Sequence, residues 1–372
     1  MNAERLQAVL DALRADFARS NLASLVDAVA TAYTQSLSSP SPSTIQSLDT
    51  QMIALSEATQ DSAAASLSPS AERLLNAIGG AGLVGQGLSD HVSRLIAGTE
   101  SPAAAVVSLQ QLVEKLTTFH DSVTKAYTSL KALGVTPSIL PDDSCEVGVT
   151  VPEELVGASL GGFQRKLGDF DRTVRTFAEV TGEEVVSPPL RDLARSSYQF
   201  FIAVAPLTAA AIATAIERSV ALYKQILEIR KLRGELEQRS VPAGALDAIK
   251  AHEGAMIDAA VSRVKDEILL AYAGDLARKN ELSTALETAI KFLAGQIDKG
   301  VDVEVTCNDP SHEPVSALDD DRDPKSLFQA YERVRSAGSA IRTLPADRAP
   351  VLFLPPAPTE PPAPTDPGVQ ML

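Results

Sequence analysis

The stretch Ser197–Arg239 reads SYQFFIAVAPLTAAAIATAIERSVALYKQILEIRKLRGELEQR. It carries no charged residue before Glu217, where a charged amphipathic pattern begins. Pro206 has no backbone N–H and favours extended geometry in the residue before it. The stretch therefore predicts a strand at Tyr198–Val204 and a helix at Leu207–Arg239, with the break at the proline.

The predicted strand holds β-prone apolar side chains on both of its faces, among them Phe200, Phe201 and Ile202. Such a pattern is typical of a strand that is buried on both sides. In the predicted helix, apolar residues such as Ile212 and Ile216 recur at spacings of four and three, which marks one helical face. At ~1.5 Å rise per residue, this helix is about 50 Å long. We expect the rest of the chain to be organised around these two elements.

The uncharged run from Phe200 to Ile216 also permits a second interpretation, in which it enters a bilayer. A span needs about 20 predominantly apolar residues. The run reaches that length only if the polar residues from Ser196 to Gln199 are counted, and it is rich in alanine. Membrane contact is therefore an alternative to core burial for this segment. Its candidate residues are Phe200, Phe201, Ile202, Pro206, Ile212 and Ile216.

Length and composition favour a cytoplasmic, multi-domain protein with an aliphatic, helical core. The chain has 372 residues, no tryptophan and a net charge of −15. This charge argues against a nucleic-acid partner, because binding to phosphates requires a basic surface. The two cysteines do not form a disulfide framework and fit a reducing compartment. The N-terminal segment lacks the apolar core of a secretory signal.

Residues 1–134 predict a bundle of amphipathic helices. Ser68 and Ser101 each precede a proline, and a capping hydroxyl followed by proline marks the start of a helix. Gly134 is suited to the end of the last helix. The expected helices are Ala3–Gln35 with a break at Ser20, Thr44–Gln60, Ser70–Ile78, Leu88–Ile96 and Ala103–Leu133.

Two later segments alternate strictly between apolar and polar residues, as half-buried strands do. They are Cys145–Val151 and Val301–Cys307. With Tyr198–Val204 they predict a three-stranded sheet, and the strand buried on both faces belongs in its centre. In that order the two cysteines lie on opposite edges, too far apart to bond. If the two alternating strands instead pair antiparallel with each other, Cys145 can oppose Cys307.

Residues 145–307 therefore predict a second unit, in which helices pack with this small sheet. The short turn Ser240–Gly244 predicts an antiparallel hairpin formed by the helix that ends at Arg239 and the next, Ala245–Ala277. Two further helices are expected, one from Pro152 to about Val180 and one at Glu281–Ile297. The expected fold class is mainly α with a small β-sheet (α+β). An N-terminal bundle precedes a long helical hairpin that packs with three strands.

The C-terminal part divides into two segments. Residues 308–343 predict an acidic loop followed by a short helix that begins after Asp323. Residues 344–372 contain nine prolines and predict an extended tail without a packed core. Such a tail is either a spacer or a ligand for an aromatic-lined groove on a protein partner. The candidate partner-binding residues of the tail are Phe353, Pro355, Pro358, Pro361 and Pro364.

We single out no residue as catalytic, cofactor-binding or metal-ligating. The spacing GxGxxG at Gly80–Gly85 follows a predicted helix, whereas a dinucleotide fingerprint follows a strand, so a turn between helices is the better interpretation. Cys307 and His312 are five residues apart, but zinc sites of this type usually show paired cysteines. No nucleophile, P-loop or kinase signature is present.

Two phrases carry a resemblance to other sequences. They are AIERSVALYKQILEIRKLRGEL at Ala215–Leu236 and EVGVTVP at Glu146–Pro152. Together they resemble a pattern in uncharacterised bacterial proteins of similar size, over roughly Leu130–Val305. The resemblance implies a shared body of helices and a small sheet. It implies no activity and no functional residues.

Three functions are compatible with this sequence. The first is a non-enzymatic interaction or assembly protein, which the long amphipathic helices and the tail favour; it binds a protein partner or a second copy. The second is a helical protein that inserts Phe200–Ile216 into a membrane, by analogy with pore-forming proteins. The third is an enzyme of a type that the sequence does not reveal.

Overall fold

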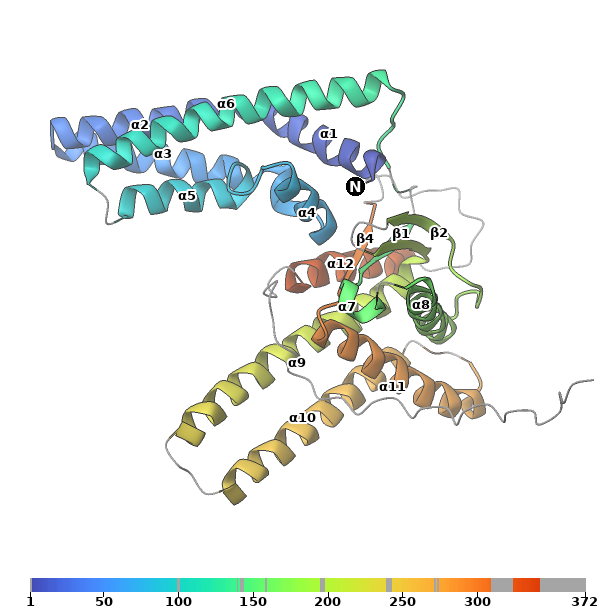
Figure 1. The fold of residues 1–372 in the computed structure, drawn as a ribbon. Coiled ribbons are helices and arrows are strands. Elements are labelled where there is room, and N and C mark those ends of the chain that lie inside the picture. Colours follow the sequence, from blue (N-terminus) through green and yellow to red (C-terminus); the bar gives the residue numbers. More distant parts are fainter. Residues whose placement is uncertain are drawn as a thin grey trace, which may run out of the picture.

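The computed structural model has two parts, an N-terminal helical bundle and a body of helices around a small sheet (Figure 1). The structure describes residues 2–98, 101–138, 140, 144–157, 159–194, 198–238, 243–270, 272, 274–308 and 324–341. The expected class, mainly α with a small β-sheet, is confirmed.

Six α-helices build the bundle, and serine or asparagine caps begin most of them. Asn2 and Asn21 accept hydrogen bonds from the first turns of α1 and α2, so the expected break at Ser20 is present. Ser68 and Ser101 cap α4 and α6 just before a proline, as predicted. The helices are α1 (Ala3–Arg19), α2 (Leu22–Ser38), α3 (Pro42–Gln60), α4 (Pro69–Ala77), α5 (Gly85–Ala97) and α6 (Pro102–Ala132), with a short 3-10 turn η1 at Ala63–Ser66.

The sheet has four antiparallel strands rather than the three expected. Its order is β2 (Leu190–Ala194), β3 (Gln199–Val204), β1 (Cys145–Thr150) and β4 (Asp302–Cys307). We predicted that Tyr198–Val204 is the central strand of the sheet. This prediction was incomplete, because β3 and β1 are both interior strands. The short strand β2 was missed. Its sequence places Arg191 and Asp192 between two leucines, so apolar and polar residues do not alternate strictly. A bulge between Leu190 and Asp192 also interrupts its register with β3.

One face of the sheet packs on helices and forms the main core. Val147, Phe200 and Val303 are buried on this face together with their neighbours at alternate positions. Helices α8 (Leu160–Val180), α9 (Pro206–Gln238), α11 (Leu276–Asp298) and α12 (Pro324–Ile341) supply the opposing side chains. Most residues of this core are aliphatic, as the composition predicted, but Phe170, Phe177 and Tyr223 are among its largest fully buried side chains.

Two helices are shorter than the sequence indicated. The predicted helix from Pro152 to Val180 is split into α7 (Glu153–Val156) and α8. Gly157 adopts a positive φ of 63° that ends α7, and Ser159 then caps α8. The second hairpin helix, α10 (Ala243–Leu269), ends before the predicted Ala277.

Helices α9 and α10 form the expected antiparallel pair, which extends away from the sheet as a two-helix arm (Figure 1). The base of the arm is buried among α11 and α12, where Ile212, Ile216 and Tyr223 belong to the main core. Farther out, Arg230 and Arg233 both pair with the buried carboxylate of Glu253, at 3.4 and 2.8 Å. We call the part of α9 and α10 from residue 227 to residue 253 the distal arm.

Candidate functional site

The second face of the sheet is covered by the N-terminal bundle. The sequence predicted that the polar residues of the alternating strands face solvent. That prediction was wrong for Glu146 and Glu304, which are only 3% and 5% exposed. Helices α1 and α4 lie over this face (Figure 1). The buried carboxylates therefore meet donors from the bundle instead of water.

Arg5 of α1 provides the central contact. Its Nη2 donates to both carboxylate oxygens of Glu146, at 3.0 and 2.9 Å, and its Nε donates to Asp192 at 2.9 Å. The guanidinium also stacks on the ring of Phe201, 3.2 Å from its centroid. Two carboxylates and an aromatic face are the groups that a planar guanidinium binds best. Neighbouring side chains reinforce the contact, since Asn2 donates to Asp192 and Arg191 lies 3.1 Å from Glu146.

Gly148 makes room for this arrangement. It lies opposite Phe201 on one neighbouring strand and opposite Glu304 on the other. A Cβ atom at this position would lie 2.6 Å from the Phe201 ring and 2.8 Å from Cγ of Glu304. Glycine therefore lets the ring and the carboxylate side chain lie flat across β1.

A second set of contacts joins α4 to the sheet. Glu304 accepts hydrogen bonds from the backbone N–H of Ser70 at 2.7 Å and from its hydroxyl at 2.6 Å. This places a carboxylate at the N-terminus of α4, where the helix dipole favours negative charge. Arg73 pairs with Asp302 and donates to Thr150 at 2.8 Å. We call the contacts of α1 and α4 with the sheet, centred on Arg5 and Ser70, the polar latch.

Burial raises the pKa of Glu146 above its ordinary value. Desolvation is the largest cause, because it disfavours the charged form. Arg5 opposes it through charge and hydrogen bonding, and Arg191 opposes it through charge, whereas the nearby Glu304 raises the pKa further. The latch therefore holds a buried carboxyl group whose charged form is disfavoured by burial and favoured by the two guanidinium groups beside it.

The bundle and the body have separate hydrophobic cores. The bundle core holds residues from Val9 to Val123, and the body core holds residues from Cys145 to Ala337. Phe201 is buried yet belongs to neither core. The two parts thus meet through the polar latch rather than through a shared apolar interior.

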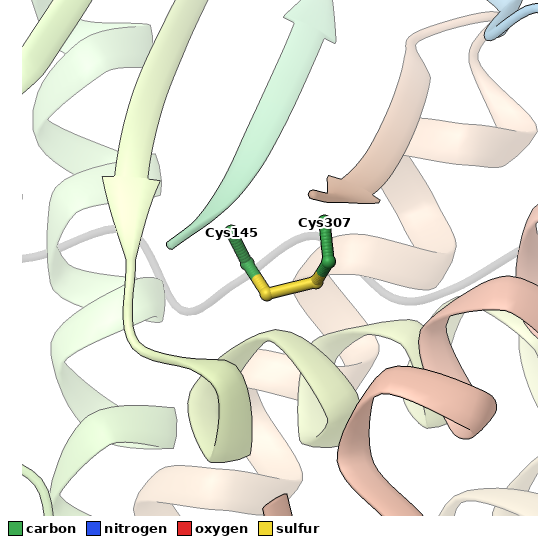
Figure 2. Close-up of a disulfide and its surroundings, with 2 residues drawn as sticks. All are labelled: Cys145 and Cys307. Atoms are coloured by element: carbon green, nitrogen blue, oxygen red, sulfur yellow. A yellow bond between two sulfur atoms is a disulfide. The ribbon is translucent and has the colours of Figure 1, made fainter. Parts of the chain in front are cut away.

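Cys145 and Cys307 form a disulfide between β1 and β4 (Figure 2). The two cysteines are directly opposite in the antiparallel register, with Cα atoms 4.1 Å apart. This is the alternative in which the alternating strands pair with each other. The favoured order, with the cysteines on opposite edges and too far apart to bond, was wrong. Both sulfurs lie on the face that packs on the helices, and Cys145 is fully buried.

The candidate membrane segment is divided between two elements. Phe200, Phe201 and Ile202 are buried in β3, Pro206 begins α9, and Ile212 and Ile216 are buried in the body core. Within the described part of the chain, no helix is long and apolar enough to cross a membrane. Membrane insertion remains a prediction, which leakage from lipid vesicles would test.

The other predicted features lie in several places. The GxGxxG spacing forms a turn between α4 and α5, as expected, and its last glycine, Gly85, begins α5. Among the described residues, no three of His, Cys, Asp and Glu gather as a metal site. His312 and the tail residues Phe353, Pro355, Pro358, Pro361 and Pro364 lie outside the described residues.

The residues of the polar latch were not predicted as a site. Glu146 and Glu304 occupy equivalent polar positions in the two alternating strands, and this was the available signal. The alternation indicated only that both glutamates lie on the polar face of their strands. Arg5 gave no signal, because a cation in the first turns of an amphipathic helix is normally solvated. Its partner lies 141 residues away in the sequence.

No protein-family model matches this chain, and no curated protein or solved structure shows significant similarity to it.

Proposed function

We propose that this chain is a non-enzymatic interaction or assembly protein that binds a protein partner or a second copy through its helices. The observation that carries the proposal is the distal arm. There, α9 and α10 project beyond the core that covers their base (Figure 1). Leu232 is 59% exposed, and Ile229, Leu236, Leu246 and Ile249 are only partly covered.

Two helices alone cannot enclose an apolar seam, because each presents a stripe wider than one neighbour covers. A third helix that lies along the distal arm would complete the burial, as in helix-in-groove recognition. The buried ion pairs of Glu253 with Arg230 and Arg233 hold the two helices in register for such a partner. The arm thereby offers a surface for a helix of another protein or of a second copy.

Measurement of mass in solution and capture of partners test this proposal. We expect Leu232→Ser to weaken self-association or partner capture at least tenfold. The matched control is Leu270→Ser, at a leucine that is 84% exposed outside the distal arm. A wild-type chain that stays monomeric and captures no partner would contradict the proposal. Equal effects of the two substitutions would indicate that the binding surface lies outside the distal arm.

The cellular compartment is part of the same proposal. The sequence predicts the cytoplasm, and that remains a prediction. The Cys145–Cys307 disulfide weighs against it, because disulfides persist mainly in oxidising compartments. Mass spectrometry of the protein trapped with an alkylating reagent in its own cells distinguishes the two. Free thiols would support the cytoplasm, and an intact bridge would support an oxidising compartment.

A further inference from the structure

The polar latch has the properties of a contact that can open and re-form. Its two sides belong to units that each have their own hydrophobic core. The contacts between them are hydrogen bonds, ion pairs and one cation–π contact, supplied by Asn2, Arg5, Ser70 and Arg73 of the bundle. When such a contact opens, both apolar cores stay intact, and the groups newly exposed to water are the polar side chains of the latch and the ring of Phe201.

The sheet side of the latch is a site for a guanidinium group. Phe201 forms its floor, and Glu146 and Asp192 supply the carboxylates. Glu304 and Asp302 continue the acidic surface toward α4. When the latch is open, the sheet therefore presents an acidic face with one aromatic ring. A helix that carries cationic side chains is complementary to this face.

The bundle of a second copy can make the same contacts as the chain's own bundle, because it carries the same Arg5, Ser70 and Arg73. Complementarity between the two surfaces is already present within one chain. The connection between α6 and β1 includes the ten residues 135–144, which can span about 35 Å when extended. Exchange of an identical element between copies is a low-cost route to a dimer.

We propose that two copies of this chain associate by exchange of their N-terminal bundles, so that Arg5 of each copy occupies the guanidinium site of the other. This inference rests on the proposed function in its self-association form, and it names a surface distinct from the distal arm. The closed chain and the exchanged dimer contain the same latch contacts. Their balance depends on protein concentration.

A charge-reversal pair tests the exchange. Arg5→Glu places a carboxylate against Glu146 and Asp192, and Glu146→Arg places a guanidinium against Arg5 and Arg191. Each variant is repelled within its own chain and in a dimer with itself. In a mixture of the two variants, both latches of an exchanged dimer regain opposite charges. We therefore expect the mixture to associate at least tenfold more strongly than either variant alone.

The readout is co-capture of two differently tagged chains, followed by light scattering for a species of twice the 39.2 kDa chain mass. A chain with both Arg5→Glu and Glu146→Arg is the control, since it regains opposite charges both within itself and in an exchanged dimer, and it should co-capture a second copy as the wild type does. Co-capture in the mixture no stronger than for each variant with itself overturns the exchange. Association through the distal arm would persist in that case, so the proposed function would still stand.

A second pair keeps the test decisive if Glu146→Arg fails to fold by circular dichroism. Arg73 and Asp302 pair with each other, and their side chains are 36% exposed against 4% for Glu146, so Arg73→Glu and Asp302→Arg are better tolerated. Arg73→Glu mixed with Asp302→Arg should again co-capture at least tenfold more strongly than either variant with itself. Equal capture in all three samples overturns the proposal.

Discussion

At Gly148 the sheet has no space for a side chain. The ring of Phe201 is held under Arg5, and the side chain of Glu304 is anchored by Ser70, so neither can easily move aside. Position 148 therefore affects both the packing of β1 and the contact between the sheet and the bundle.

We expect Gly148→Ala to lower the free energy of unfolding by about 1–3 kcal/mol, as overpacking of a close contact does. Denaturant unfolding measures the change. Gly168→Ala is the control, because Gly168 lies in α8 with no atom within 4 Å of the added Cβ. That substitution should stabilise the chain by about 0.5–1 kcal/mol. A neutral Gly148→Ala would mean that the sheet and the bundle are farther apart than described.

The Arg5–Glu146 pair gives the latch a pH dependence. Because burial raises the folded-state pKa of Glu146, the folded chain binds this proton more readily than the unfolded chain. The carboxyl therefore contributes stability below its ordinary pKa of 4.5, and this contribution is lost as the pH rises through the raised pKa. Removal of Arg5 takes away the largest opposing influence and raises the pKa further.

We expect Arg5→Met to lower the free energy of unfolding by about 3 kcal/mol at pH 7, because it leaves a buried charge poorly compensated. The loss should shrink toward pH 4, where Glu146 takes up its proton. Denaturant unfolding at several pH values measures this. Lys125→Met, at an exposed cation on α6, should stay within about 0.5 kcal/mol throughout. A loss independent of pH would show that Glu146 is not the group concerned.

At the scale of elements, the disulfide ties an interior strand to an edge strand. The bridge joins residues 162 positions apart and encloses the helices of the body except α12. In the chain-entropy account, closing a loop of this length restricts the unfolded chain strongly.

We expect reduction of the bridge to destabilise the body by about 3–5 kcal/mol. Thermal unfolding with and without a thiol reductant measures this. A chain with both Cys145→Ser and Cys307→Ser should match the reduced wild type and should not respond to reductant. If the double variant were as stable as the oxidised wild type, the bridge would have no stabilising role.

Burial of β3 is a second prediction at this scale. Phe200 is 1% exposed, so Phe200→Asp places an unpaired charge in the body core and should cost more than about 4 kcal/mol. Leu232→Asp, at an exposed position of the distal arm, should change stability by less than about 1 kcal/mol. Thermal unfolding compares the two. Similar losses would indicate that the distal arm is packed in solution.

Local signals in the sequence predicted most elements, but pairing between distant segments was beyond them. Ser68, Ser101 and Pro206 fixed the starts of helices because capping and proline geometry act within a few residues. The alternation at Cys145–Val151 identified a strand and its two faces. It did not identify what covers each face, since that depends on residues more than a hundred positions away. For this reason the favoured sheet order was wrong, the pairing of the two cysteines was only an alternative, and the polar latch was missed.

At the scale of the whole molecule, the separate cores predict unfolding in two steps. The bundle has its own apolar interior and lies outside the loop that the disulfide closes. Calorimetry should therefore show two transitions. Hydrogen exchange read by mass spectrometry should assign one transition to residues 2–132 and the other to the body. Reductant should lower only the transition of the body. A single transition that shifts as a whole would mean that the latch couples the two cores completely.

The position of β4 near the end of the body has a consequence during synthesis. The bundle is complete when residue 132 leaves the ribosome, whereas β4 begins only at Asp302. At 5–20 residues per second, Cys145 waits roughly 10–30 s for Cys307 to be translated. For that interval Glu304 does not exist, and β1 lacks one of its two neighbours. A nascent chain stalled before residue 302 would therefore carry a folded bundle next to an unfinished sheet, in which Cys145 is not yet bridged.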